Sequence, residues 1–162
     1  MPDLKIKTRA GGDKSLHETA LQNFKGALRG RVVLPGSPEY DEARTIWNAM
    51  IDRRPALIAR CASAEDVVQA VRLARENDFV LAVRGGGHNI AGNAVCDGGL
   101  MIDLSPMKSV RVDSGKRIVH VEAGVTLGEF DTAAQAFGLA TPLGINSTTG
   151  VAGLTLGAAS AG

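Results

Sequence analysis

The sequence has few of the features that mark nucleic-acid-binding or membrane proteins. Its 162 residues include 18 Lys and Arg against 17 Asp and Glu, a formal net charge of +1. Such a balance indicates no basic surface for nucleic acid or for an anionic membrane. No apolar run is long enough to span a bilayer, and the polar N-terminus lacks the apolar core of a signal peptide. We therefore expect no nucleic-acid partner, no membrane partner and a cytoplasmic location.

Cysteine and aromatic residues are also scarce. Cys61 and Cys96 lie far apart and form no C-x-x-C pattern, which favours two reduced, partly buried thiols over a disulfide. We predict no metal site. Aromatic residues make up 4% of the chain, whereas 44% is hydrophobic and 20 residues are glycine. This composition is typical of an ordinary folded core with many loops.

Three consecutive glycines at 85–87 are the most informative feature of the chain. The apolar residues 80–83 predict a buried strand that ends at Arg84. Glycines permit positive φ and the close approach of another group, and free N–H groups in such a loop can hold an anionic oxygen. His88 and Asn89 follow directly. The segment therefore predicts a phosphate-binding loop with one chemically active side chain at its rim.

Two common glycine motifs do not fit this loop. The dinucleotide fingerprint G-x-G-x-x-G needs a third glycine where Ile90 stands. A P-loop needs lysine and then serine or threonine where Asn93 and Ala94 stand. The loop therefore belongs to neither of these phosphate-binding types.

The first quarter of the chain predicts an extension followed by alternating elements. Residues 1–14 are polar, and we expect them to be loosely ordered. A capping box at 15–18 begins a helix that Gly30 ends. A short strand follows at 31–34, and a second helix is predicted from Ser37 to Trp47.

A parallel strand–helix–strand unit is predicted before the glycine loop. It comprises a strand at 55–59, a helix capped by Ser63 and the strand at 80–83. The helix is expected to bury one face made of Val67, Val68, Val71 and Ala74. Because ligands bind at the carboxyl ends of such strands, the glycine loop stands where a site is expected.

The second part of the chain predicts antiparallel structure. Residues 100–104 form a strand, and 110–112 and 118–121 flank a turn as in a hairpin. A second capping box at 126–129 begins another helix. A run rich in glycine and threonine follows at 145–154.

Several segments in this order resemble the FAD-linked oxidases of the vanillyl-alcohol oxidase type, most of all the berberine bridge enzyme branch. Residues 84–89 followed by 98–107 carry the resemblance first. Segments 121–125, 141–144 and 149–154 resemble further flavin-lining segments of that family. Each segment alone is weak, but their common order at plausible spacing is specific, and the resemblance covers about residues 31–157.

The resemblance implies an α+β, PCMH-type FAD-binding fold with FAD held between two lobes. Residues 1–30 would form an N-terminal extension with the first helix. A small parallel lobe would cover about 31–99, and a larger antiparallel lobe about 100–162. The implied FAD-binding residues are Arg84, Gly85, Gly86, Gly87, His88, Asn89, Gly92, Pro142, Gly144, Thr149, Gly150 and Gly153.

The resemblance also implies a reaction. An organic alcohol, sugar, amine or alkaloid would give a hydride to FAD, and O₂ would reoxidise the flavin. In the family, the histidine at the position of His88 bonds to the 8α-methyl carbon of the flavin, and histidine is readily neutral near pH 7. Asn146 stands where some members carry a cysteine for a second bond, so one covalent link is expected. For His88 the alternative is a polar residue in a turn.

Other parts of the interpretation stay open from the sequence alone. Arg84 either neutralises phosphate charge or pairs with a carboxylate, and Asp103 is expected to shape the turn after its strand. Residues 157–162 depart from the family, which has a glycine triplet and a long continuation there. We therefore expect the FAD-binding portion without its C-terminal substrate domain, and assign no catalytic residue. The alternative function is a non-catalytic FAD- or nucleotide-binding module.

Overall fold

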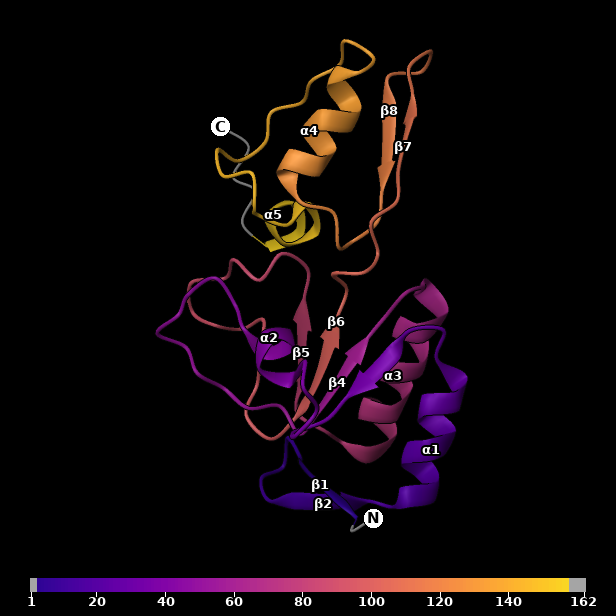
Figure 1. Ribbon diagram of the computed structural model, residues 1–162, viewed down its shortest axis with the longest axis vertical. Helices are drawn as coiled ribbons and strands as arrows, with labels where there is room; N and C mark the ends of the chain where they lie inside the picture. Colours follow the sequence, from indigo (N-terminus) through magenta and orange to yellow (C-terminus); the bar gives the residue numbers. More distant parts are fainter. Residues whose placement is uncertain (1–2, 158–162) are drawn as a thin grey trace.

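The chain folds into two lobes stacked along the long axis of the molecule (Figure 1), in a computed structural model that describes residues 3–157. The first lobe contains β1 (Leu4–Lys7), β2 (Asp13–Leu16), α1 (Glu18–Ala27), β3 (Arg31–Val33), α2 (Tyr40–Arg44), β4 (Leu57–Arg60), α3 (Ala64–Asn77), β5 (Leu81–Arg84) and β6 (Leu100–Asp103). The second lobe contains β7 (Val110–Asp113), β8 (Ile118–Val121), α4 (Leu127–Gln135) and α5 (Val151–Gly157). Helices combined with parallel and antiparallel strands confirm the predicted α+β class.

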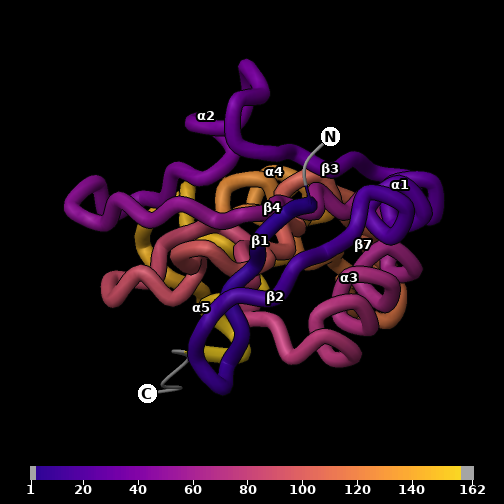
Figure 2. The backbone as a smooth tube through the Cα atoms, turned by 90° about the horizontal axis from the view of Figure 1, so that it is seen from below, coloured from indigo at the N-terminus to yellow at the C-terminus, as the bar shows by residue number. Residues whose placement is uncertain are grey.

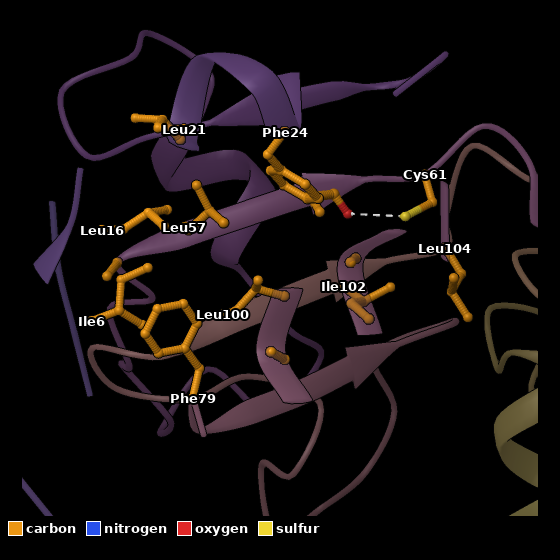
Figure 3. Packing of buried hydrophobic residues seen from close by; sticks show 14 of the residues in the cluster. Ile6, Leu16, Leu21, Phe24, Leu57, Cys61, Phe79, Leu100, Ile102 and Leu104 are labelled. Carbon is orange, nitrogen blue, oxygen red and sulfur yellow. Dashed lines mark hydrogen bonds between the residues drawn. The ribbon is translucent and has the colours of Figure 1, made fainter. Parts of the chain in front are cut away.

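A four-stranded sheet with the order β3-β4-β6-β5 forms the centre of the first lobe. Strands β4, β6 and β5 are parallel, and β3 pairs with β4 in the antiparallel direction. Leu100 and Ile102 of β6 face a core shared with α1 and α3, whereas Met101 faces the cluster that includes α2. Figure 3 shows Leu57, Leu100 and Ile102 packed among Leu21 and Phe24. The sheet is thus covered on both faces, as parallel sheets usually are.

The strand before the glycine loop is an edge strand rather than the buried strand predicted from residues 80–83. Ala82 is buried, but Leu81 is 37% exposed and Val83 is 49% exposed. The strand at the centre of the parallel set is β6, whose four residues are all buried. The predicted boundary puts residues 100–104 in the second lobe, whereas β6 pairs with β4 and β5 in the first. The boundary near residue 100 is therefore wrong, and the second lobe begins after β6.

Residues 3–14 are held in regular structure, contrary to the expectation of a loosely ordered segment over 1–14, of which residues 1 and 2 lie outside the described residues. Strands β1 and β2 pair as a hairpin at the end of the molecule away from the second lobe, nearest the viewer in Figure 2. Ile6 is fully buried, and backbone hydrogen bonds join Lys7 to Gly98 and Val80 at 2.8 Å each. Since Ser15 lies in β2, it does not cap a helix, and the N-cap of α1 is His17, two residues later than predicted. The conformation of this segment is therefore set by its contacts with the rest of the first lobe and not by its local sequence.

Helix α3 begins where predicted and buries only part of the predicted face, since Ala74 is buried and Val67 packs against the core. The Ser63 hydroxyl accepts a hydrogen bond from the Asp66 N–H, which confirms the cap. Val68 and Val71 are exposed, whereas Ala70 and Ala74 are buried. Small residues allow the helix to approach the sheet closely. The predicted helix over 37–47 is shorter than expected, since only the five residues of α2 are helical.

The second lobe stands over the carboxyl ends of β5 and β6 (Figure 1). Its core joins the β7–β8 hairpin, α4 and α5, with Val125 and Leu127 fully buried. The capping box of α4 is present, because the Glu129 carboxylate accepts the Thr126 N–H at 2.7 Å. In the described residues the antiparallel sheet of this lobe is the two-stranded β7–β8 hairpin. None of the helices between residues 3 and 157 is long and apolar enough to cross a bilayer.

Candidate functional site

A cavity of about 400 Å³ lies between the glycine loop after β5 and the segment that enters α5. This volume is within the range of about 300–1,000 Å³ that is usual for small-molecule sites. The cavity brings together most of the residues predicted from the sequence. Its lining consists of Val83, Gly85, Gly86, Gly87, His88, Asn89, Asn93, Ala94, Thr149, Gly150, Gly153, Leu154 and Gly157.

The two lobes meet backbone to backbone at this cavity. A Cβ atom added at Gly86 would lie 2.6 Å from the Cα of Gly150, and one added at Gly150 would lie 2.9 Å from the Cα of Gly86. A Cβ at Gly85 would lie 3.0 Å from the Ala123 carbonyl oxygen. Glycine at 85, 86 and 150 therefore allows the lobes to approach. Close approach was predicted for this loop, but its partner here is the second lobe.

The glycine loop lines the cavity and carries backbone donors that no backbone acceptor uses. Within the described part of the chain, the N–H groups of Gly86, Gly87 and His88 have no backbone acceptor. Gly87 adopts a φ of 72°, which glycine tolerates best, and its carbonyl accepts the Trp47 N–H at 3.1 Å. No acidic side chain among residues 3–157 lines the cavity. Such a set of donors suits the oxygens of a phosphate group.

His88 is half-buried at the rim of the cavity and is held from two sides. Its Nε2 atom lies 2.7 Å from the hydroxyl oxygen of Thr148. The indole ring of Trp47 stacks on the imidazole, with 5.2 Å between ring centroids and 23° between ring planes. Since both contacts come from other segments, the imidazole is positioned by tertiary structure and is not a free side chain in a turn.

Arg84 is not among the residues that line this cavity, and it forms an ion pair. Its guanidinium contacts the fully buried carboxylate of Asp103 at 2.8 and 3.1 Å, and Arg60 contacts the same carboxylate at 3.0 Å. Burial alone would raise the pKa of the Asp103 carboxyl, but Arg84 and the hydrogen bonds from Ser105 hold that pKa below its ordinary value. Of the two roles weighed for Arg84, the structure shows the pairing with a carboxylate. Asp103 shapes the turn after β6, as predicted.

Three other predicted residues lie outside the cavity. Gly92 contacts the Ile51 side chain, and its carbonyl accepts a hydrogen bond from Arg53 at 2.8 Å. Gly144 packs between Leu127 and Leu154 within the second lobe. Pro142 lines a separate cavity of about 600 Å³ near β8 and α4. These residues shape the loops around the site, whereas the residues at 85–89, 149, 150 and 153 form its wall.

Several residues of the site were not singled out from the sequence. Val83, Asn93, Ala94 and Leu154 line the cavity, and Trp47 and Thr148 contact His88. Val83 was missed because the strand was predicted to be buried on both sides. Thr148 lies in the run rich in glycine and threonine at 145–154. The contacts of Thr148 and Trp47 with His88 join residues far apart in the chain, so no local sequence pattern predicts them. Among the described residues, no group of three or more His, Cys, Asp and Glu side chains could hold a metal ion.

Comparison with known families identifies the ligand class. Residues 55–162 match the family described as "FAD binding domain". The chain belongs to this family. FAD, the cofactor predicted from the sequence, is thereby confirmed, and the described residues fit it. The N–H groups of the glycine loop that lack a backbone acceptor suit a pyrophosphate, and the loop lines the adjoining cavity.

Named relatives agree with this assignment. (R)-6-Hydroxynicotine oxidase of Paenarthrobacter nicotinovorans is 38% identical over 130 residues, 80% of this chain and 28% of that protein. An FAD-linked oxidoreductase of Bacillus subtilis, YgaK, is 39% identical over 133 residues, 82% of this chain and 30% of that protein. The chain therefore spans less than a third of the length of these relatives.

Solved structures show the same fold. Physcomitrella patens BBE-like 1 superposes with a TM-score of 0.78 and 28% identity, over 85% of this chain and 30% of that one. The crystal structure of 6-hydroxy-D-nicotine oxidase from Arthrobacter nicotinovorans gives a TM-score of 0.76 and 38% identity, over 78% of this chain and 28% of that one. The PCMH-type fold and the resemblance to FAD-linked oxidases are confirmed.

Proposed function

We propose that this chain is the FAD-binding part of an FAD-dependent oxidoreductase and that His88 bonds covalently to the flavin. Bound FAD supplies the redox chemistry, accepting a hydride from an organic substrate and passing the electrons to O₂. The observation that carries the proposal is the placement of His88. Its imidazole lines the cavity beside free N–H groups and is held by Trp47 and Thr148.

The residues of the site divide the work of binding. The N–H groups of the loop 85–87 would donate to the pyrophosphate of the cofactor. Because the loop consists of glycines, it places no side chain between the two lobes where their backbones meet. Thr149, Gly150 and Gly153 form the opposite wall from the second lobe. The ion pair of Arg84 and Asp103 holds the ends of β5 and β6 together beneath the loop. Binding energy thus comes mainly from backbone atoms placed by the fold.

The covalent link joins one imidazole nitrogen of His88 to the 8α-methyl carbon of the flavin. One hydrogen is lost from the imidazole and one from the methyl group. The two protons and two electrons go to O₂, which gives H₂O₂, so the flavin ends in its oxidised form. Neutral histidine is a suitable nucleophile near pH 7.

We propose an alcohol, sugar, amine or alkaloid as the reducing substrate. The support is the chemistry named for the relatives, which include a 6-hydroxynicotine oxidase and a xylooligosaccharide oxidase of Myceliophthora thermophila. Anaerobic mixing of the flavin-loaded protein with members of each class, followed by flavin absorbance, tests this part. Saturable bleaching by one class identifies the substrate.

Intact-mass spectrometry of the acid-denatured protein tests the covalent link. We expect a flavin adduct on the natural chain and none on His88→Ala, which should still bind FAD that dialysis removes. His120→Ala is the matched control, because His120 is exposed on the β7–β8 hairpin and should keep the adduct. An adduct that persists in His88→Ala would place the bond on another side chain and overturn the assignment.

A further inference from the structure

We propose that Thr148 and Asn146 are positioning residues that hold His88 in a single tautomer, with the proton on Nε2 and the lone pair on Nδ1. The inference rests on the proposed covalent link, because it identifies Nδ1 as the nitrogen that bonds the flavin. It follows from two hydrogen bonds between Thr148 and Asn146 and from a third that joins Thr148 to His88 of the glycine loop.

The backbone N–H of Thr148 determines the orientation of the Asn146 amide. The backbone N–H of Thr148 lies 3.1 Å from the Oδ1 atom of Asn146. A backbone N–H can only donate, so the amide atom that faces it has to be the oxygen. The reversed amide would place two donors against each other. The side chain of Asn146 is therefore an acceptor on the side that faces Thr148.

The Asn146 amide in turn determines the direction of the hydrogen bond from the Thr148 hydroxyl. Its oxygen lies 2.8 Å from the same Oδ1 atom of Asn146. An amide oxygen carries no hydrogen, so the hydroxyl has to donate to it. A hydroxyl has one hydrogen to donate and two lone pairs that accept. Toward any further partner, Thr148 is therefore an acceptor.

The Thr148 hydroxyl then determines which imidazole nitrogen of His88 carries the proton. Nε2 of His88 lies 2.7 Å from the Thr148 hydroxyl oxygen, and that oxygen can only accept. Nε2 must then carry the proton. A neutral imidazole has one N–H group, so Nδ1 has the free lone pair that a nucleophile needs. Trp47, stacked on the ring, fixes the plane in which this lone pair points.

The chemistry balances with this assignment. Bond formation through Nδ1 joins nitrogen to the 8α carbon, and the surplus proton on Nε2 passes to water beside the half-exposed ring. The 8α carbon loses its own proton, and the two electrons go to O₂, which becomes H₂O₂. The hydrogen bond to Thr148 thus acts through His88 and does not itself touch the reacting carbon.

Nitrogen NMR of the protein labelled with ¹⁵N-histidine tests the tautomer directly, on chain prepared from riboflavin-starved cells. Long-range ¹H–¹⁵N correlations distinguish a protonated Nε2 from a protonated Nδ1. We expect the Nε2–H pattern for His88 at pH 7.5, assigned by its absence in His88→Gln. A protonated Nδ1 in the natural chain would overturn the inference, whatever happens to the adduct.

Substitutions at Thr148 connect the tautomer to the bond. Thr148→Val keeps the size of the side chain but removes the hydroxyl. We expect it to mix the two tautomers and to slow adduct formation on added FAD by about tenfold, as removal of outer partners of histidine does in metal sites. Thr148→Ser keeps the hydroxyl and should restore both. Unchanged ¹H–¹⁵N signals of His17 and His120 are the control that each variant is folded.

The two proposals fail in different ways. An Nε2–H tautomer with no adduct in the natural chain would leave the positioning role intact and remove the covalent link. An adduct that forms at the normal rate in Thr148→Val, with His88 still in one tautomer, would remove the positioning role and leave the link. Equal mixing of tautomers in Thr148→Ser and Thr148→Val would also contradict the role of the hydroxyl.

Discussion

Gly86 and Gly150 pack against each other without side chains between them, one from each lobe. A Cβ on either residue would overlap the backbone nitrogen of the other. The φ of Gly86 is not in the left-handed region, so its need for glycine comes from this contact and not from its own backbone conformation. The pair therefore sets how closely the second lobe approaches the carboxyl ends of β5 and β6, where the cavity lies.

Substitution of Gly86 by alanine should consequently weaken both folding and FAD retention. Overpacking of this kind costs about 1–3 kcal/mol, and here the overlapping atoms are backbone, which cannot turn aside as a side chain can. Urea unfolding measures the stability, and flavin absorbance after desalting measures retention. Gly26→Ala in α1 is the control, because a Cβ there meets no atom within 4 Å and alanine favours helix. A Gly86→Ala protein as stable and as yellow as the natural one would show that the lobes do not need this contact.

The local signals in the sequence were sufficient for several elements. The β7–β8 hairpin, the cap at Ser63 and the capping box at Thr126 follow from residues within a few positions of one another. The place of β6 could not be predicted in this way. Its pairing joins Leu100 to Leu57 of β4, 43 positions away, and to Leu81 of β5, 19 positions away, and strand order is not encoded in the pattern of one strand.

In the site, too, residues in local motifs could be predicted from the sequence, whereas contacts between distant residues could not. The glycine motif and its resemblance located the wall of the cavity at 85–89 and at Gly150. The side chains that hold His88 come from Trp47 and Thr148, the second of which lies 60 positions along the chain. Arg84 was ambiguous for the same reason, since its buried partner Asp103 lies on a neighbouring strand. Contacts across the chain need the fold before they can be assigned.

Asp103 should make the stability of the fold depend on acid pH. Its folded pKa lies below the ordinary value of about 3.9 for a free Asp, because Arg84 and Ser105 favour the charged carboxylate over the effect of burial. The stabilisation is therefore fully present above about pH 4 and is lost as pH falls through the folded pKa. Urea unfolding between pH 7 and pH 3 should show a steeper loss in the natural chain than in Asp103→Asn.

The same variant should be destabilised at pH 7. Asp103→Asn leaves Arg84, whose side chain is 11% exposed, with a neutral partner. Loss of one partner from a buried pair costs about 3–5 kcal/mol. Asp113→Asn is the matched control, since its pair with Lys116 is on the surface and such pairs contribute at most about 1 kcal/mol. Equal stability losses in the two variants would mean that the buried network does not hold the strand ends.

Asp66 should matter for stability in a different way. Its carboxylate is buried and accepts N–H groups from Arg29, Gly30 and Ala62 at 2.8–2.9 Å, which ties the start of α3 to the turn before β3. Asp66→Asn would turn an amide N–H₂ toward one of these donors, a loss of about 1–3 kcal/mol. Glu76→Gln, exposed on the same helix, should change the unfolding free energy little. An Asp66→Asn midpoint equal to that of Glu76→Gln would contradict this role.

The two thiols should be unreactive in the folded protein, which bears on where the flavin attaches. Burial raises the pKa of Cys61 to about 12 and that of Cys96 to about 11, and both residues are free cysteines. Since the thiolate is the nucleophile, roughly one thiol in a thousand or fewer is reactive at pH 8. A thiol reagent at pH 8 should label neither residue in native protein and both in urea. Rapid labelling of Cys96 in the native state would instead make it a competitor of His88 for the flavin, and the adduct of a Cys96→Ala variant would then have to be measured beside that of His88→Ala.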